Sequence, residues 1–466
     1  MSRNDLEEAE TWAVRTFGLA ELGDLRRTDR LVQLAAALAR DPQSSLPASL
    51  RGEAETVGAY RFLNNPHLSP EQILMPHWVQ TRREAASREQ VLMIGDTTDC
   101  NLSSHHRLQG AGPVGRGSLA QGFFIHSVLA RDAKTEELLG CAYQHPFVRQ
   151  PAPEKETKGK QKQRARESQV WEQSVRGIGP VPSGTQWIYV GDRGSDIFPF
   201  WQACQKLGYD FTIRVAQDRG VLGEESEGSS DPALLHLKSR VRQLPAQDIR
   251  VLALPATDSH PARDAVVEVS FEPVRIQPPI HNATLDKTEL LLWAVRVWEP
   301  LSPAGVEPLE WILLTSVPVL TVEDAWERAR WYRCRWLIEE FHKVLKSGCR
   351  LEDRRMRTVS ALENLLAILT PIGMRLLRLR DLARLSPDLP ATQVVSQEVV
   401  NVVAELSARP QVEWTVRDLC CAIARFGGFL VRKCDGLPGW QTLWHGWVFV
   451  QTVLLGVHLA ALLPPS

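Results

Sequence analysis

Three carboxylate side chains occur at positions where the predicted elements would bring acids to a common site. Asp96 ends the apolar run VLMIGD, Asp192 ends the apolar run WIYVGD, and Glu339 lies within WYRCRWLIEEFHKVLK. Acids that follow the strands of a mainly parallel sheet point into the crevice where open α/β folds place their sites. Such carboxylates can hold two divalent ions about 4 Å apart for in-line phosphoryl transfer. The sequence therefore predicts a two-metal site made by these three acids.

The segment around Glu339 also carries groups that suit a phosphate. If residues 322–346 form one long helix, Tyr332, Arg335, Glu339 and Lys346 fall within about 60° of one another on its surface. Arginine binds phosphate as a fork and lysine as a point charge. We expect Arg335 and Lys346 to grip flanking phosphates. Hard oxygen ligands favour magnesium as the metal, and manganese can substitute.

Each acid taken alone is weak evidence, because an acid after a strand is common and a glutamate pair on a helix is usually solvated. Asp99 and Asp196 are rival ligands. Asp99 ranks below Asp96 because it lies beyond the predicted strand end. Asp196 ranks below Asp192 because it is expected to cap or open the following helix.

Hydrophobic periodicity predicts the elements that must position these residues. Residues 1–70 have helical patterns and form a small helical module. Beyond about residue 71, the strands expected at 123–130 and 138–143 pair around a turn at 132–136. Strands at 91–96, 123–130, 138–143, 187–192 and 209–215 alternate with helices at 167–176 and 195–206. This order predicts an α/β unit with both faces of its sheet covered. The region from 216 to 310 has an all-β pattern, with GEESEGSSD (223–231) as a loop.

The remaining segments are mainly helical. After the helix at 322–346, another is predicted at 362–385, and the rest of the chain has helical patterns. The Pro-led, basic stretch at 151–167 is expected to be an exposed loop. The apolar run at 448–463 falls short of the roughly 20 residues of a membrane span, so we expect a packed or interfacial helix.

Composition limits the possible partners and compartment. The chain has 54 basic and 55 acidic side chains, so DNA affinity must come from local clusters of Lys and Arg, at 155–166 and at 343–357. None of the 8 cysteines has the CxxC spacing of a zinc site or redox dithiol, which favours reduced thiols in a cytoplasmic protein. The acidic N-terminus has no apolar core and is not expected to be a signal peptide.

The segment YRCRWLIEEFHKVLK resembles the Tyr-Arg-Glu-Lys signature of the IS-four family of bacterial DDE transposases. Tyr332, Arg335, Glu339 and Lys346 match that signature position by position. Other segments resemble the family in the same order, up to about residue 358. They are LGDLRRTDRL, GAYRFLNNP, IGDTTDCN, HSVLA, GDRGSDI and WILLTS.

The resemblance implies the fold class and the domains. It implies an α/β fold with an RNase H-like catalytic core at 71–365, which carries a β-rich insertion at about 216–310. A helical domain at 1–70 would recognise transposon ends, and a helical domain at 366–466 would serve dimerisation. Asp96 would contact both metals, and Asp192 and Glu339 would each complete one.

The resemblance also implies residues that contact DNA. Trp311 stands where the family has an aromatic that stacks on a base flipped out during hairpin formation, although a core aromatic is the alternative. Arg214 resembles a position near the DNA backbone, although an arginine after a strand is often in a surface ion pair.

Arg26, Arg27 and Arg30 resemble residues that bind transposon ends, and the alternative is a solvated face balanced by Asp24 and Asp29. Lys343, in the basic cluster at 343–357, is counted with the DNA-binding residues.

The expected function is cut-and-paste DNA transposition by a homodimer. Water would hydrolyse one strand at each transposon end, the freed 3′-hydroxyl would form a hairpin, and after hairpin opening it would attack target DNA. The partners would be double-stranded DNA with terminal inverted repeats and target DNA, with no membrane, and the bound protein would be associated with the nucleoid. A domesticated metal-dependent nuclease and a catalytically silent DNA-binding regulator are the alternatives.

Overall fold

The computed structural model describes residues 8–50, 52–115, 119–149, 167–222, 234–254, 262–279, 288–409, 413–432 and 436–461. The loops predicted at 151–167 and 223–231 lie almost wholly or wholly outside the described residues. The chain folds into two compact units. The first unit comprises Met1–Ala85, Thr97–Lys162 and Glu339–Ser466, and the second comprises Ala86–Asp96 and Gln163–Ile338.

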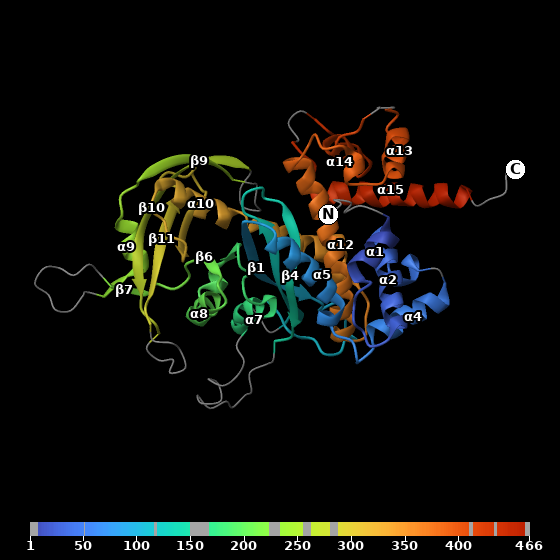
Figure 1. The fold of residues 1–466 in the computed structure, drawn as a ribbon, viewed down its shortest axis with the longest axis horizontal. Coiled ribbons are helices and arrows are strands. Elements are labelled where there is room, and N and C mark those ends of the chain that lie inside the picture. The colour runs from blue at the N-terminus through green and yellow to red at the C-terminus, as the bar shows by residue number, and fades with distance from the viewer. Residues whose placement is uncertain are drawn as a thin grey trace, which may run out of the picture. The chain divides into compact units, whose positions relative to one another are not determined.

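The second unit is built on a mixed sheet (Figure 1). Its strands, in spatial order, are β1 (Gln90–Asn101), β5 (Gln186–Gly191), β6 (Asp210–Arg214), β12 (Glu310–Thr315), β11 (Leu290–Trp298), β10 (Arg263–Ile276), β7 (Gly220–Leu222) and β8 (Leu234–His236), and β9 (Asp248–Leu254) pairs with β10. The β1–β5 and β5–β6 pairs are parallel, and the pairs from β6 onward are antiparallel. The α/β fold class is confirmed, since parallel strands with intervening helices carry an antiparallel extension.

Helices cover both faces of the parallel strands. On one face Tyr189 contacts Trp171 of α7 (Gln169–Ile178) and Phe200 of α8 (Phe198–Lys206). Neighbours along a strand point to opposite faces, and Ile188 on the other face is also fully buried. Helix α10 (Val322–Arg333) packs against β5 and β6.

The region from 216 to 310 is not all-β, because α9 (Leu237–Gln243) interrupts it. Leu237 and Val241 are buried one turn apart, whereas the basic side chains between and after them lie outside the core. This i, i+4 pattern is helical, but it spans only two turns and is easily missed between strands.

The first unit is mainly helical. Its N-terminal helices are α1 (Ala9–Phe17), α2 (Leu25–Arg40), α3 (Leu46–Ser49), α4 (Glu53–Leu63) and α5 (Pro70–Ala86). Its strands are β2 (Gly112–Pro113), β3 (Gln121–Asp132) and β4 (Leu138–Phe147), with β3 and β4 forming the predicted antiparallel pair. Its C-terminal helices are α12 (Val359–Leu385), α13 (Gln397–Leu406), α14 (Val416–Phe426) and α15 (Trp440–Ala461).

Helix α12 forms the core of the first unit. It packs against α2, α4, α14, α15 and β4, and nearly all its side chains are buried. Two of its buried polar side chains bond to neighbouring elements: Asn364 Nδ2 donates to the Leu63 carbonyl at 2.9 Å, and Thr370 Oγ1 donates to Gln144 Oε1 at 2.7 Å. These bonds offset the cost of burying the amide N–H and the hydroxyl.

The single long helix predicted at 322–346 is wrong. α10 (Val322–Arg333), which Thr321 caps, is followed by α11 (Trp336–Lys343) and the π-helical turn η2 (Val344–Gly348).

Between α10 and α11 the backbone tightens. The Arg335 N–H donates to the Tyr332 carbonyl at 3.0 Å, and the Leu337 N–H donates to the Cys334 carbonyl at 3.1 Å. These bonds span three residues instead of four, so the chain turns faster than an α-helix. The signature residues therefore do not share the face of one uninterrupted helix.

The apolar run near the C-terminus forms a longer helix than predicted. α15 has 22 residues, and both its Trp440–Ala460 stretch and α12 are long and apolar enough to cross a membrane by length and composition alone. In α12 89% of the most apolar window is buried, which identifies a core helix, whereas in α15 the share is 33%. Apolar side chains such as Phe449, Val457 and Leu459 of α15 are exposed.

Candidate active site

Asp96 and Asp192 follow neighbouring parallel strands at the same register. The last residue pair of the β1–β5 ladder is Gly95 with Gly191, and the two acids come directly after it. Both side chains are half-buried. β5 ends before Asp192 as predicted, but β1 continues to Asn101. Asp96 therefore follows the last paired residue of β1 but lies within that strand.

The glycine before each acid is required by close packing. A Cβ added at Gly95 would lie 2.1 Å from the Tyr189 hydroxyl, and one at Gly191 would lie 2.3 Å from Ser195 Oγ. Real Cβ atoms do not approach other atoms so closely, so a larger residue would displace the strand end. The repeated Gly-Asp pairs thus have a structural cause that fixes both acids.

Arg335 contacts one of these acids directly. Its Nη1 donates to Asp96 Oδ2 at 2.8 Å, with both side chains largely buried. Its guanidinium also lies 5.9 Å from the Tyr332 ring centre and 5.8 Å from that of Trp336. The sequence pointed to phosphate for Arg335 and did not predict this carboxylate partner.

The other signature residues have separate surroundings. Glu339 is half-buried on α11, in the first unit. Lys346 Nζ lies 3.4 Å from Asp99 Oδ1 and 4.0 Å from Glu352 Oε1. Asp99 belongs to β1, so the prediction that it lies beyond the strand end is wrong.

The described residues contain no group of three or more His, Cys, Asp or Glu side chains that could hold a metal ion. The pair Asp96 and Asp192 nevertheless offers hard carboxylate oxygens from adjacent strand ends, which is the chemistry that divalent magnesium or manganese prefers. The donor type therefore fits a divalent ion, and assignment of the full three-acid set stays a prediction.

Asp196, the rival of Asp192, is a structural residue. Its side chain is fully buried, and it accepts hydrogen bonds from the backbone N–H groups of Ala216 and Gln217, each at 2.7 Å. Arg219 Nη2 donates to it at 2.6 Å. The expectation that Asp196 caps the next helix is wrong, because Ile197 is the N-cap of α8.

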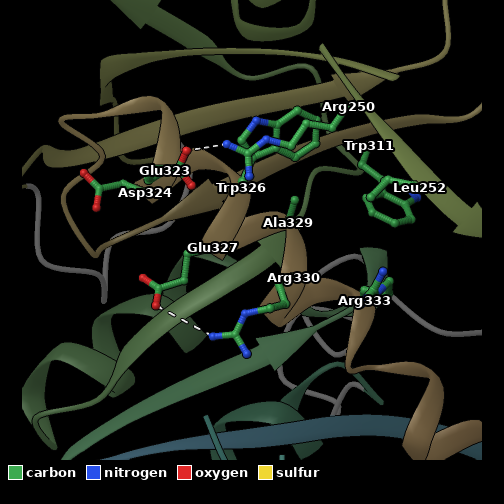
Figure 2. A pocket seen from close by; sticks show the side chains of 10 residues that line it. All are labelled: Arg250, Leu252, Trp311, Glu323, Asp324, Trp326, Glu327, Ala329, Arg330 and Arg333. Atoms are coloured by element: carbon green, nitrogen blue, oxygen red, sulfur yellow. Dashed lines mark hydrogen bonds and ion pairs between the residues drawn. The ribbon is translucent and has the colours of Figure 1, made fainter. Parts of the chain in front are cut away.

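Trp311 lies beside the signature tyrosine. Its ring is edge-on to Tyr332, with centroids 5.3 Å apart, and only 6% of the residue is exposed. Figure 2 shows Trp311 lining a cavity of about 550 Å³ in the second unit. The other lining residues are Arg250, Leu252, Glu323, Asp324, Trp326, Glu327, Ala329, Arg330 and Arg333.

The predicted DNA-contacting residues outside this region lie in different environments. Arg214 is half-buried at the end of β6, where its Nη2 donates to the Glu310 carbonyl at 2.9 Å instead of forming a surface ion pair. Lys343 is exposed at the end of α11.

The three arginines of α2 also differ from one another. Arg26 is exposed and pairs with the N-cap residue Asp24 at 2.8 Å, Arg27 Nη1 donates to the Leu22 carbonyl at 2.9 Å, and Arg30 lines a small cavity. The role of these arginines in DNA binding stays a prediction.

One arginine of the basic cluster at 343–357 is buried and bonds to backbone carbonyls within the first unit. Arg354 is 5% exposed and donates to the Cys349 carbonyl at 3.0 Å and to the carbonyls of Pro42 and Ser44. Arg354 therefore ties the segment after η2 to the N-terminal helices and is not available to DNA. Sequence composition could not separate it from its solvated neighbours.

Three family models match the chain in sequence order. They are transposase DNA-binding at residues 9–68, transposase DDE domain at 161–372, and transposase Tn5 dimerisation domain at 371–461. Among solved structures, the chain is similar to a piggyBac transposase in a synaptic complex with hairpin DNA. That match covers 97% of this chain and 70% of the other, at 10% identity and a TM-score of 0.34, a level at which it carries no argument.

Proposed function

Because this chain belongs to the Tn5-like DDE transposases, which are metal-dependent enzymes that cut and transfer DNA, we propose that it performs cut-and-paste transposition with Asp96, Asp192 and Glu339 as the metal ligands. Magnesium is the proposed cofactor, for which manganese substitutes. The observation that carries the proposal is the placement of Asp96 and Asp192 directly after the last in-register pair of two parallel strands.

The acids and their neighbours have distinct tasks in this proposal. When bound, the divalent ions activate the attacking oxygen and stabilise the leaving oxygen. Asp96 and Asp192 would hold these ions from the sheet, and Glu339 would hold them from α11. Arg335, bonded to Asp96, fixes the orientation of that carboxylate, and we expect it also to contact a flanking phosphate.

The proposed reaction consists of successive phosphoryl transfers. Water attacks the phosphodiester at each transposon end and releases a 3′-hydroxyl. That hydroxyl attacks the opposite strand to form a hairpin, a second water opens the hairpin, and the 3′-hydroxyl then attacks target DNA. Each step breaks one P–O ester bond, which releases a 3′-hydroxyl, and forms a new P–O bond to the attacking water or 3′-hydroxyl oxygen, so one set of ligands serves all of them.

The chain carries a DNA-binding segment at 9–68 and a dimerisation segment at 371–461. We propose that the DNA-binding segment binds the transposon ends through Arg26, Arg27 and Arg30. Contacts to DNA near the cut site are proposed for Arg214, Lys343 and Lys346. The exposed apolar side chains of α15 supply the kind of surface that a second copy would cover.

The test uses DNA that carries the native terminal repeats of the element, incubated with the full chain and magnesium. We expect a nick with a free 3′-hydroxyl, then a hairpin, then joining to a second DNA, all blocked by a chelator. Cutting without joining would identify a domesticated nuclease. Binding without cutting would identify a silent regulator and would refute the catalytic proposal.

Trp311 is proposed to stack on a base that leaves the helix during hairpin formation. Stacking of a base on an aromatic contributes about 1–3 kcal/mol, or roughly 5- to 150-fold in rate if it is made only in the hairpin step. Trp311→Ala should therefore slow hairpin formation by that factor and slow first-strand nicking much less, as measured in single-turnover assays on the same DNA.

Two variants control for disturbed packing around Trp311. Trp311→Phe keeps an aromatic face and should retain most of the hairpin rate. Trp326→Ala removes another tryptophan that lines the same cavity, and it should affect nicking and hairpin formation alike. Equal slowing of both steps by Trp311→Ala would exclude the stacking role.

A further inference from the structure

We propose that His126 is a positioning residue for the cleavage reaction: through its hydrogen bond to Thr97 it fixes the part of β1 that follows Asp96. This inference rests on the proposed assignment of Asp96 as a metal ligand. It concerns a buried side chain to which neither the signature nor the proposed mechanism gives a role.

His126 is a polar residue in β3, a strand that is buried along its whole length after the first residue. It is 0% exposed, and Phe123, Ile125, Val128 and Leu129 of β3 are fully buried as well. Burial lowers the pKa of His126 to about 3, with smaller contributions from His342 and His145, so the ring is neutral. A neutral imidazole has one donor and one acceptor nitrogen, and burying it is costly unless they are satisfied.

The partner of the ring is the residue next to the candidate ligand. The His126 Nδ1 and Thr97 Oγ1 atoms are 2.8 Å apart, a hydrogen bond whose donor depends on the tautomer. Thr97 directly follows Asp96 and is half-buried. The bond therefore acts one residue away from the Asp96 carboxylate.

The position of Thr97 explains why such a bond is needed. β1 pairs with β5 only as far as Gly95, so the residues of β1 beyond Gly95 have no backbone pairing with β5. On the other side β3 stays close. The Leu102 N–H donates to the Gln121 carbonyl at 2.7 Å, and a Cβ added at Gly122 would lie 1.8 Å from the Cys100 carbonyl oxygen. The His126–Thr97 bond holds the start of this one-sided segment.

The His126–Thr97 bond acts on the backbone beside the candidate ligand and not on the ligand itself. Partners of this kind orient metal ligands without touching the metal, and their loss typically lowers metal affinity or activity about 10- to 100-fold.

The test compares Thr97→Val, which removes the hydroxyl but keeps the shape, with Thr97→Ser, which keeps the hydroxyl. We expect Thr97→Val to lower the kcat of first-strand nicking about 10- to 100-fold while the KM for end DNA changes less than about twofold. Thr97→Ser should recover most of that loss. Thr98→Val is the matched control, because among the described residues the Thr98 hydroxyl bonds only to the Asp99 carbonyl, at 3.5 Å, and should be dispensable.

A second measurement does not depend on turnover. Binding of Mn²⁺ to the complex of enzyme and end DNA, followed by the loss of the free-ion electron paramagnetic resonance signal, should be weakened about tenfold or more by Thr97→Val and by His126→Leu. His126→Asn places a polar atom near the former Nδ1 and should bind Mn²⁺ more tightly than His126→Leu.

Two outcomes would overturn the inference. One is nicking and Mn²⁺ binding by Thr97→Val within about twofold of the wild type, and the other is a Thr97→Ser variant no better than Thr97→Val. Failure of the wild type itself to nick and to bind Mn²⁺ would instead refute the proposed function, so the two failures are distinguishable.

Discussion

Asp96→Asn is expected to lower the rate of first-strand nicking by at least about 10³-fold while binding of end DNA is retained. The amide keeps the size of the carboxylate but loses the charge that would hold a divalent ion, and such ions stabilise the transition state by several kcal/mol, at about 1.4 kcal/mol per tenfold in rate. Nicking is measured in single turnover, and DNA binding by a gel shift with a chelator present.

Asp192→Asn and Glu339→Gln should cause losses of similar size, and a double variant should be little worse than either single one. Residues that act as one unit are non-additive, because once the site is disabled a second removal costs little more. Asp99→Asn is the matched control: Asp99 is on the same strand and 41% exposed, and it contacts Lys346 instead of the strand-end pair. A loss for Asp99→Asn as large as that for Asp96→Asn would mean that the ligand is misassigned.

The strands around the candidate site could be predicted because their residues are apolar throughout. Residues 91–94 and 187–190 are fully buried between two helical layers, and a continuous apolar run is the signature of such a strand. The strand pair at 123–130 and 138–143 could be predicted from similar apolar runs. What the runs could not reveal is that β1 continues beyond its apolar run to Asn101, into residues that no longer pair with β5.

The errors arose where tertiary contacts override local pattern. A helical period continues through Cys334 and Arg335, and no proline or glycine marks the break, yet the backbone tightens there and Arg335 reaches Asp96. Sequence spacing gives no sign of a partner 239 residues away. The same holds for Arg354, whose burial beside the N-terminal helices removes it from the basic cluster.

Asp96 and Asp196 show why the type of residue alone could not rank the acids. Both lie close to a strand end and near an arginine, and the acceptor positions of Asp196 are occupied by the backbone and by Arg219. Its Oδ2 accepts two N–H groups, and its Oδ1 accepts Nε and Nη2 of Arg219. A carboxylate with all its acceptor positions occupied has nothing left to offer a metal.

Asp196→Asn is therefore expected to destabilise the second unit by about 3–5 kcal/mol, because it leaves the buried Arg219 without its counter-charge and can turn an amide N–H toward backbone donors. Thermal unfolding of the full chain should show a midpoint lowered by roughly 6–20 °C. Adding Arg219→Met removes the uncompensated positive charge and should recover part of the lost stability. If Asp196→Asn instead unfolded like the wild type but lost nicking and Mn²⁺ binding, Asp196 would replace Asp192 as the ligand.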